Sequence, residues 1–128
     1  MQKVTILIYV ESRYKADRKR IKSAVNAVLE ENKVQSSVEV SIAIVGDRKM
    51  RKLNKEYRNL DKTSNVLSFP LAEGESSHLP NDVIRLGDIV VSYPEVIRES
   101  AAKEFLVDDR VDELVKHGML HLLGLHHE

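Results

Sequence analysis

Four of the five histidines in this 128-residue chain lie within its last twelve residues, HGMLHLLGLHHE. His117 and His121 are four residues apart, so on a helix their side chains lie on the same face. Both imidazoles can then reach one ion at the usual zinc–nitrogen distance of about 2.0–2.1 Å. This spacing predicts a metal site on the C-terminal helix.

A third ligand must come from beyond the helix, and Gly124 is placed where the chain can turn back towards the ion. His127 has the right offset, while His126 and Glu128, through its side chain or the terminal carboxylate, are alternatives. Three protein ligands leave a fourth position for water, which is typical of catalytic zinc.

The spacing H-x3-H-x2-G-x2-H is also that of the metzincin zinc proteases. Those enzymes carry a glutamate general base directly after the first histidine, where this chain has Gly118. We therefore expect a reaction that needs only metal-activated water or hydroxide and a cation to stabilise developing charge. Cleavage of a phosphodiester bond meets that description.

The elements that must position these residues follow from hydrophobic periodicity. Strands are predicted over 4–10, 38–45, 66–69 and 86–92, with a long loop between the last two, over 70–85. Helices are predicted around 21–29, after a cap at Asp47, after a cap at Ser92, and from Asp108 or Asp109 to about Leu123. This order predicts an α+β (mixed α/β) fold in which a single mixed sheet of about four strands is covered by helices. We expect one metallohydrolase domain over residues 1–128.

Charge is balanced overall, with 20 basic and 20 acidic residues, but it is unevenly distributed. Residues 47–62 contain seven Lys or Arg against three acids, whereas residues 95–113 reverse that ratio. A basic side can hold a polyanion, although a solvated helix face explains the same pattern. The chain has no Cys and no long apolar segment, so we expect a cytoplasmic protein without membrane association.

Three motifs together resemble the YbeY family of bacterial rRNA-maturation endoribonucleases. They are LNKEYRNLDKTSNVLSFP at 53–70, LGDIVVS at 86–92 and HGMLHLLGLHH at 117–127. The last motif departs from the family at Leu125 and His126, where the family usually has Tyr and Asp.

The resemblance implies a zinc-dependent endoribonuclease that acts in rRNA maturation and ribosome quality control. It implies that His117, His121 and His127 hold one zinc ion, with nickel or cobalt as alternatives, and that His117 and His121 are also catalytic. It implies that Arg58 binds and stabilises phosphate charge in catalysis. Ribosomal RNA is the implied partner, with the small ribosomal subunit or assembly factors as further partners.

Two other functions fit the same residues. One is a metal-containing ribosome-assembly factor without catalytic activity, and the other is a metallohydrolase of peptides or esters. Three further residues have open roles: Asp88 as a ligand-orienting or structural carboxylate, Phe69 as a base-stacking or core ring, and Glu113 as a partner of a ligand imidazole.

Overall fold

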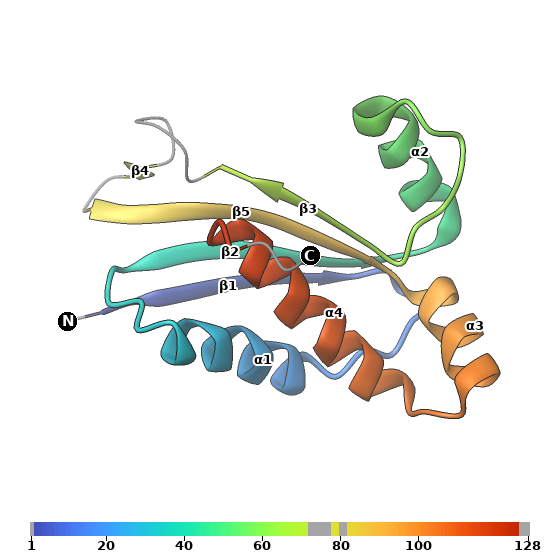
Figure 1. Cartoon of the computed structure of the whole chain (residues 1–128), viewed down its shortest axis with the longest axis horizontal. Helices are drawn as coiled ribbons and strands as arrows, with labels where there is room; N and C mark the ends of the chain where they lie inside the picture. Colours follow the sequence, from blue (N-terminus) through green and yellow to red (C-terminus); the bar gives the residue numbers. More distant parts are fainter. Residues whose placement is uncertain (1, 72–77, 80–81, 126–128) are drawn as a thin grey trace.

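A computed structural model describes residues 2–71, 78–79 and 82–125, with only the backbone described at 78–79 (Figure 1). Its elements follow the predicted order of strands and helices, with one additional short strand. In chain order they are β1 (Val4–Val10), α1 (Arg18–Glu31), β2 (Val38–Val45), α2 (Asp47–Arg58), β3 (Val66–Pro70), β4 (His78–Leu79), β5 (Val83–Ser92), α3 (Tyr93–Lys103) and α4 (Val107–Leu122).

The strands form one mixed sheet in the order β1-β2-β5-β3. β1, β2 and β5 are parallel, whereas β3 and the short β4 pair with β5 in the antiparallel direction. This arrangement confirms the α+β fold with a mixed sheet of about four strands. The predicted loop over 70–85 is shorter than expected, because β4 lies within it and β5 begins at Val83; residues 72–77 and 80–81 lie outside the described part of the chain. The sheet therefore ends at β1 on one side and at β3 on the other.

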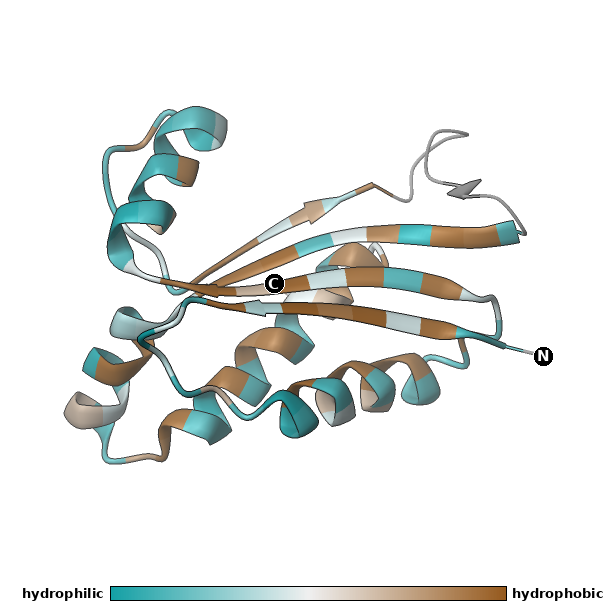
Figure 2. Cartoon of the chain, turned by 180° about the vertical axis from the view of Figure 1, so that it is seen from behind, coloured by the Kyte–Doolittle hydropathy of each residue, from teal (hydrophilic) through white to brown (hydrophobic). Residues whose placement is uncertain are grey.

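The two faces of the sheet are covered differently, as Figures 1 and 2 show. Successive strand residues point to opposite faces, and the larger core lies on the face packed against α1 and α4, with buried residues from both helices and from β2 and β5. On the other face, a small cluster of Val45, Met50, Leu67 and Val90 packs under α2. Leu7 and Tyr9 are exposed beyond it. Helices thus cover one face fully and the other only in part.

Helix starts agree with the predicted caps at one position and differ at two. The Ser92 side chain accepts a hydrogen bond from the Glu95 backbone N–H, so the cap of α3 is confirmed. The prediction for Asp47 is wrong, because Gly46 is the N-cap and Asp47 is already inside α2. α4 likewise begins before Asp108 and Asp109, which lie in its first turn and supply negative charge there.

Two glycines allow close approaches that larger residues would prevent. A Cβ at Gly118 would lie 2.9 Å from Cγ2 of Ile89, so α4 packs directly on β5 at this point. At Gly87, where φ is 137°, a Cβ would overlap the Phe69 carbonyl oxygen of β3. Gly118 thus brings the histidine-bearing turn of α4 against the sheet.

Among the residues that the structure describes, no helix is long and apolar enough to cross a membrane.

Candidate functional site

The His117 and His121 side chains converge at the C-terminal end of α4. Their Nε2 atoms are 3.0 Å apart, and the two ring centroids are 4.5 Å apart. The opposite side of the same helix buries Val115, Met119 and Leu122 against the sheet, which fixes the direction of the imidazoles. The i, i+4 spacing therefore brings the two rings together as predicted.

This geometry fits a shared metal ion. Two nitrogens on a tetrahedral zinc ion, each at about 2.0–2.1 Å, are roughly 3.3 Å apart. The observed separation of 3.0 Å differs little from that value. A small rotation of either ring would place both nitrogens at ligand distance.

The predicted third ligand is expected just after α4. Gly124 adopts the left-handed conformation, with φ of 79°, which confirms the predicted turn after α4. His127 and the alternatives His126 and Glu128 lie outside the described residues. Within residues 2–71, 78–79 and 82–125, no group of three or more His, Cys, Asp or Glu residues could hold a metal ion.

A cavity of about 360 Å³ lies beside His117, between the start of β3 and α4. Arg110, which sequence analysis did not single out, lines this cavity and donates to a Glu99 carboxylate oxygen at 3.1 Å. Glu113 lies 3.8 Å from the same guanidinium. In this structure Glu113 therefore pairs with Arg110, and its expected contact with a ligand imidazole remains a prediction.

Arg58 is the last residue of α2, and its side chain is exposed. Among the described residues, no hydrogen bond or ion pair joins Arg58 to the histidine pair. α2 covers one face of the sheet and α4 the other, with the edge strand β3 between them. The structure thus places the functional arginine implied by the family and the two histidines on different sides of the sheet.

The basic residues of the 47–62 segment all have exposed side chains, and most of them lie on α2. Figure 2 shows α2 as a largely polar helix beside the apolar strands. These residues are Arg48, Lys49, Arg51, Lys52, Lys55, Arg58 and Lys62. Seven exposed basic side chains therefore lie on α2 or just after it.

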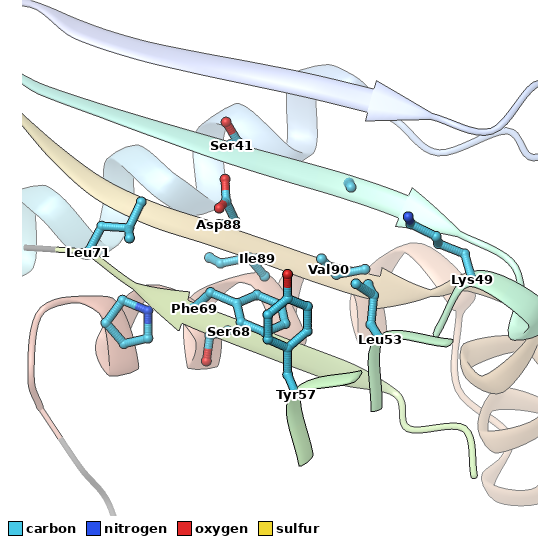
Figure 3. Close-up of a pocket in the computed structure, with 12 residues that line it drawn as sticks. Ser41, Lys49, Leu53, Tyr57, Ser68, Phe69, Leu71, Asp88, Ile89 and Val90 are labelled. Carbon is cyan, nitrogen blue, oxygen red and sulfur yellow. The ribbon is translucent and has the colours of Figure 1, made fainter. Parts of the chain in front are cut away.

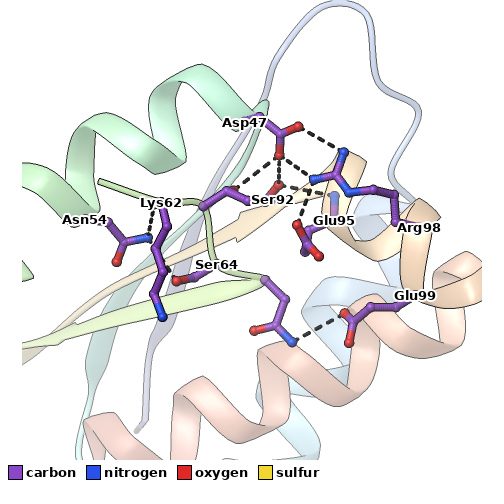
Figure 4. A network of polar contacts seen from close by, with 10 residues as sticks. Asp47, Asn54, Lys62, Ser64, Ser92, Glu95, Arg98 and Glu99 are labelled. Atoms are coloured by element: carbon purple, nitrogen blue, oxygen red, sulfur yellow. Dashed lines mark hydrogen bonds and ion pairs between the residues drawn. The ribbon is translucent and has the colours of Figure 1, made fainter. Parts of the chain in front are cut away.

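The carboxylate of Asp47 anchors the start of α2 to neighbouring elements through hydrogen bonds (Figure 4). Arg98 donates to its two oxygens at 2.8 and 3.0 Å, and the Ser92 and Thr63 hydroxyls donate at 3.2 Å each. The hydrogen bonds from Arg98 are the main reason that the pKa of Asp47 lies below its ordinary value. This network ties α2 to α3 and to the segment before β3.

A groove of about 640 Å³ lies between α2 and the open face of the sheet (Figure 3). Tyr57 and Phe69 line it, with their ring centroids 5.2 Å apart. Asp88 lines it as well, so this carboxylate lies away from the histidine pair. Phe69 also packs beside the small core cluster, which agrees with its expected core role.

An α+β domain with paired imidazoles on its last helix and a basic surface helix has the features expected of a metal-dependent nuclease. A family model described as "Endoribonuclease YbeY" matches residues 8–128. The chain therefore belongs to the YbeY family of endoribonucleases. This membership confirms the family that the three motifs predicted and, with it, the class of RNA-cleaving enzymes.

Curated relatives carry the same name. The protein from Thermoanaerobacter sp. (strain X514) is 40% identical over 116 residues, which cover 84% of this chain and 73% of that protein. The protein from Roseiflexus sp. (strain RS-1) is 39% identical over 97% of this chain and 80% of its own length. The solution structure of TM1509 from Thermotoga maritima shares the fold, with a TM-score of 0.61 and 26% identity over 97% of this chain and 75% of that chain.

Proposed function

We propose that this chain is a zinc-dependent endoribonuclease of rRNA maturation and ribosome quality control, working as one metallohydrolase domain in the cytoplasm. The observation that supports this most directly is the 3.0 Å separation of the His117 and His121 Nε2 atoms in a member of an endoribonuclease family. His127 would complete the ligand set. When bound, zinc supplies a Lewis acid that lowers the pKa of coordinated water to about 7.

The protein's own contribution is to bind and orient the RNA. The exposed guanidinium of Arg58 can bind two phosphate oxygens at once and offset the charge that develops during cleavage. The basic residues around it hold the RNA backbone without reading its sequence. Specificity for ribosomal RNA would then come from RNA shape, or from the small ribosomal subunit or assembly factors.

The separation of Arg58 from the histidine pair constrains how RNA binds. β3 is an edge strand of the sheet, and we expect one RNA strand that contacts both sides to pass around this edge. A single-stranded segment bends in this way far more readily than a duplex. The proposed substrate is therefore a single-stranded region of a ribosomal RNA precursor or assembly product.

Packing at Gly118 argues against the peptide-hydrolase alternative. Any side chain there would meet Ile89, so the glutamate base of the zinc proteases has no room on α4 in this arrangement. A reaction that does not require that base suits the site better.

The test is cleavage of precursor rRNA by purified protein with its metal content measured. We expect His121→Ala to lose both the stoichiometric ion and cleavage. Arg58→Ala should keep the ion but cleave about 100-fold more slowly, as expected for loss of a group that stabilises transition-state charge.

Lys116→Ala and Arg13→Ala are matched controls, since both residues are exposed and neither belongs to the proposed site. Both should cleave as the parent protein does. Cleavage that survives in His121→Ala and Arg58→Ala alike would come from a contaminant. Bound rRNA without cleavage by the metal-loaded parent would instead indicate an assembly factor without catalytic activity.

A further inference from the structure

We propose that the groove between α2 and the open sheet face is a subsite for an unstacked nucleotide of single-stranded RNA, with Tyr57 as its stacking ring and Lys49 as its phosphate ligand. The inference rests on the proposed function for the identity of the polymer. It adds a binding site on the face of the sheet opposite the histidine pair.

Tyr57 has the properties of a stacking platform. Its side chain is 65% exposed, although it is a large aromatic residue on a helix that otherwise presents charge to solvent. Phe69 contacts the ring edge-on, at an interplanar angle of 64°. The ring is therefore held in place while most of its surface stays open, so little conformational entropy is lost when a base stacks on it.

The groove has the size and lining that a nucleotide needs. Its volume of about 640 Å³ is in the range of small-molecule sites. Ala43 and Val90 from the sheet and Leu53 from α2 give it an apolar lining, against which the flat face of a base can lie. Figure 3 shows Tyr57 and Leu53 projecting from α2 over β5 and β3.

Charged residues at the two ends of the groove determine which way round the nucleotide lies in it. Lys49 is two turns before Tyr57 on the same side of α2, and its ammonium group borders the groove. Asp88 borders the groove from β5, and the described residues offer its carboxylate no hydrogen-bond or ion-pair partner. An ionised carboxylate repels phosphate and accepts from N–H donors, so the phosphate belongs near Lys49 and the donor edge of the base near Asp88.

Charge complementarity favours RNA over a protein occupant. The helix that forms one wall of the groove carries an excess of exposed Lys and Arg, which suits a polyanion. Aromatic rings beside basic side chains are the combination that binds single strands, because the rings stack bases and the cations bind the backbone.

The test measures binding of a labelled single-stranded oligoribonucleotide, and of a duplex of the same sequence, in full-length His121→Ala protein. In this background, Tyr57→Ala should weaken single-strand binding by about 5- to 100-fold, the usual effect of losing one stacked base. Tyr57→Phe should retain it. A 2-aminopurine in the oligonucleotide should be quenched on binding unless Tyr57 is Ala. Duplex binding should not depend on Tyr57.

Tyr9→Ala is the matched control. Tyr9 is 60% exposed and lies on the same face of the sheet, on β1, but it does not line the groove. Its replacement should leave single-strand binding unchanged. Circular dichroism and thermal unfolding of each variant show whether a loss of binding reflects a loss of fold.

Equal binding by Tyr57→Ala and Tyr57→Phe would overturn the inference, as would an equal loss of single-strand and duplex binding. A dimer that sediments in the parent but not in Tyr57→Ala would also overturn it, with a second copy as the occupant. Cleavage that depends on His121 and Arg58 but not on Tyr57 would remove the subsite and leave the proposed function intact. Single-strand binding that depends on Tyr57, found together with a metal-loaded parent protein that does not cleave rRNA, would keep the subsite and overturn the proposed function.

Discussion

Gly118 stands beside the first imidazole of α4 and faces β5, so one position controls how closely the helix approaches the sheet. The side chain of Ile89, which is fully buried, occupies the space that a Cβ would need. We expect Gly118→Ala to destabilise the protein by about 1–3 kcal/mol, the usual cost of overpacking. Urea unfolding should show a lower midpoint with an unchanged m-value.

A second substitution tests the cause of that loss. Ile89→Val removes one methyl group from the contact, so the double variant should lose less stability than the sum of the two single variants. Additive losses would show that Gly118 matters for another reason.

Sequence spacing could predict which residues converge when they lie on one helix. His117 and His121 are an example, because the helical repeat alone brings them together. It could not predict the role of Arg110, whose partner Glu99 comes from a different helix. The same holds for Asp47, because its side chain binds Arg98 and so does not cap α2. Tertiary contacts of this kind have no local pattern in the sequence.

At the scale of elements, the attachment of α2 depends on the ionised state of Asp47. The pKa of this carboxyl is lowered in the folded protein, chiefly by the hydrogen bonds from Arg98, so folding favours the charged form. Its contribution is complete above the unfolded pKa of about 4 and is lost as the pH falls through the folded value.

Asp47→Asn should therefore reduce stability at neutral pH and make less difference at low pH. Asp47 is 38% exposed, so solvent screens the pair and we expect a loss of about 1 kcal/mol at pH 7. The measurement is the free energy of unfolding between pH 2 and pH 7 for both proteins. Asp61→Asn is the control, because Asp61 lies 4.0 Å from Arg51 in a more exposed pair. A constant difference across this pH range would contradict the explanation.

The order and type of the elements could be predicted, but not all of their pairing. Periodicity located β1, β2, α1 and α2, because each has a buried side at a regular interval, and capping residues located α3 and α4. It did not show that β3 runs antiparallel to β5, nor that β4 extends the pairing of β5.

At the scale of the whole molecule, a net charge of zero conceals an uneven distribution of acidic and basic side chains. Most acidic side chains of the 95–113 segment form ion pairs with arginines. Arg20 pairs with Asp109 and Asp112, and Arg110 pairs with Glu99. The basic side chains of α2 are mostly exposed to solvent. α2 therefore carries more exposed basic side chains than acidic ones.

This uneven distribution predicts the salt dependence of RNA binding. A double variant, Lys52→Gln with Lys55→Gln, should reduce the slope of log K against log salt by about 0.7 for each phosphate that the protein no longer neutralises. Lys19→Gln with Lys22→Gln on α1 removes the same charge from exposed positions elsewhere and should leave the slope nearly unchanged. Equal slopes for the two double variants would mean that α2 is not the main contact for the RNA backbone.

The uneven covering of the sheet could not be predicted from the sequence. The pattern of α2 shows an apolar stripe of Met50, Leu53 and Tyr57, which indicates that the helix packs on something. Only the structure shows that Met50 alone is fully buried and that Tyr57 projects over a groove. The candidate RNA subsite arises from this incomplete coverage.

The two outer strands also differ in how well they resist joining another sheet. β3 has five residues and ends at Pro70, which lacks the N–H group that a neighbouring strand would require. β1 has seven residues and no proline. Arg18 donates a hydrogen bond to one backbone carbonyl oxygen of this strand, that of Ile8. Intermolecular strand addition in concentrated or partly heated samples should therefore begin along β1, and a charged residue in place of Leu7 should delay the resulting precipitation.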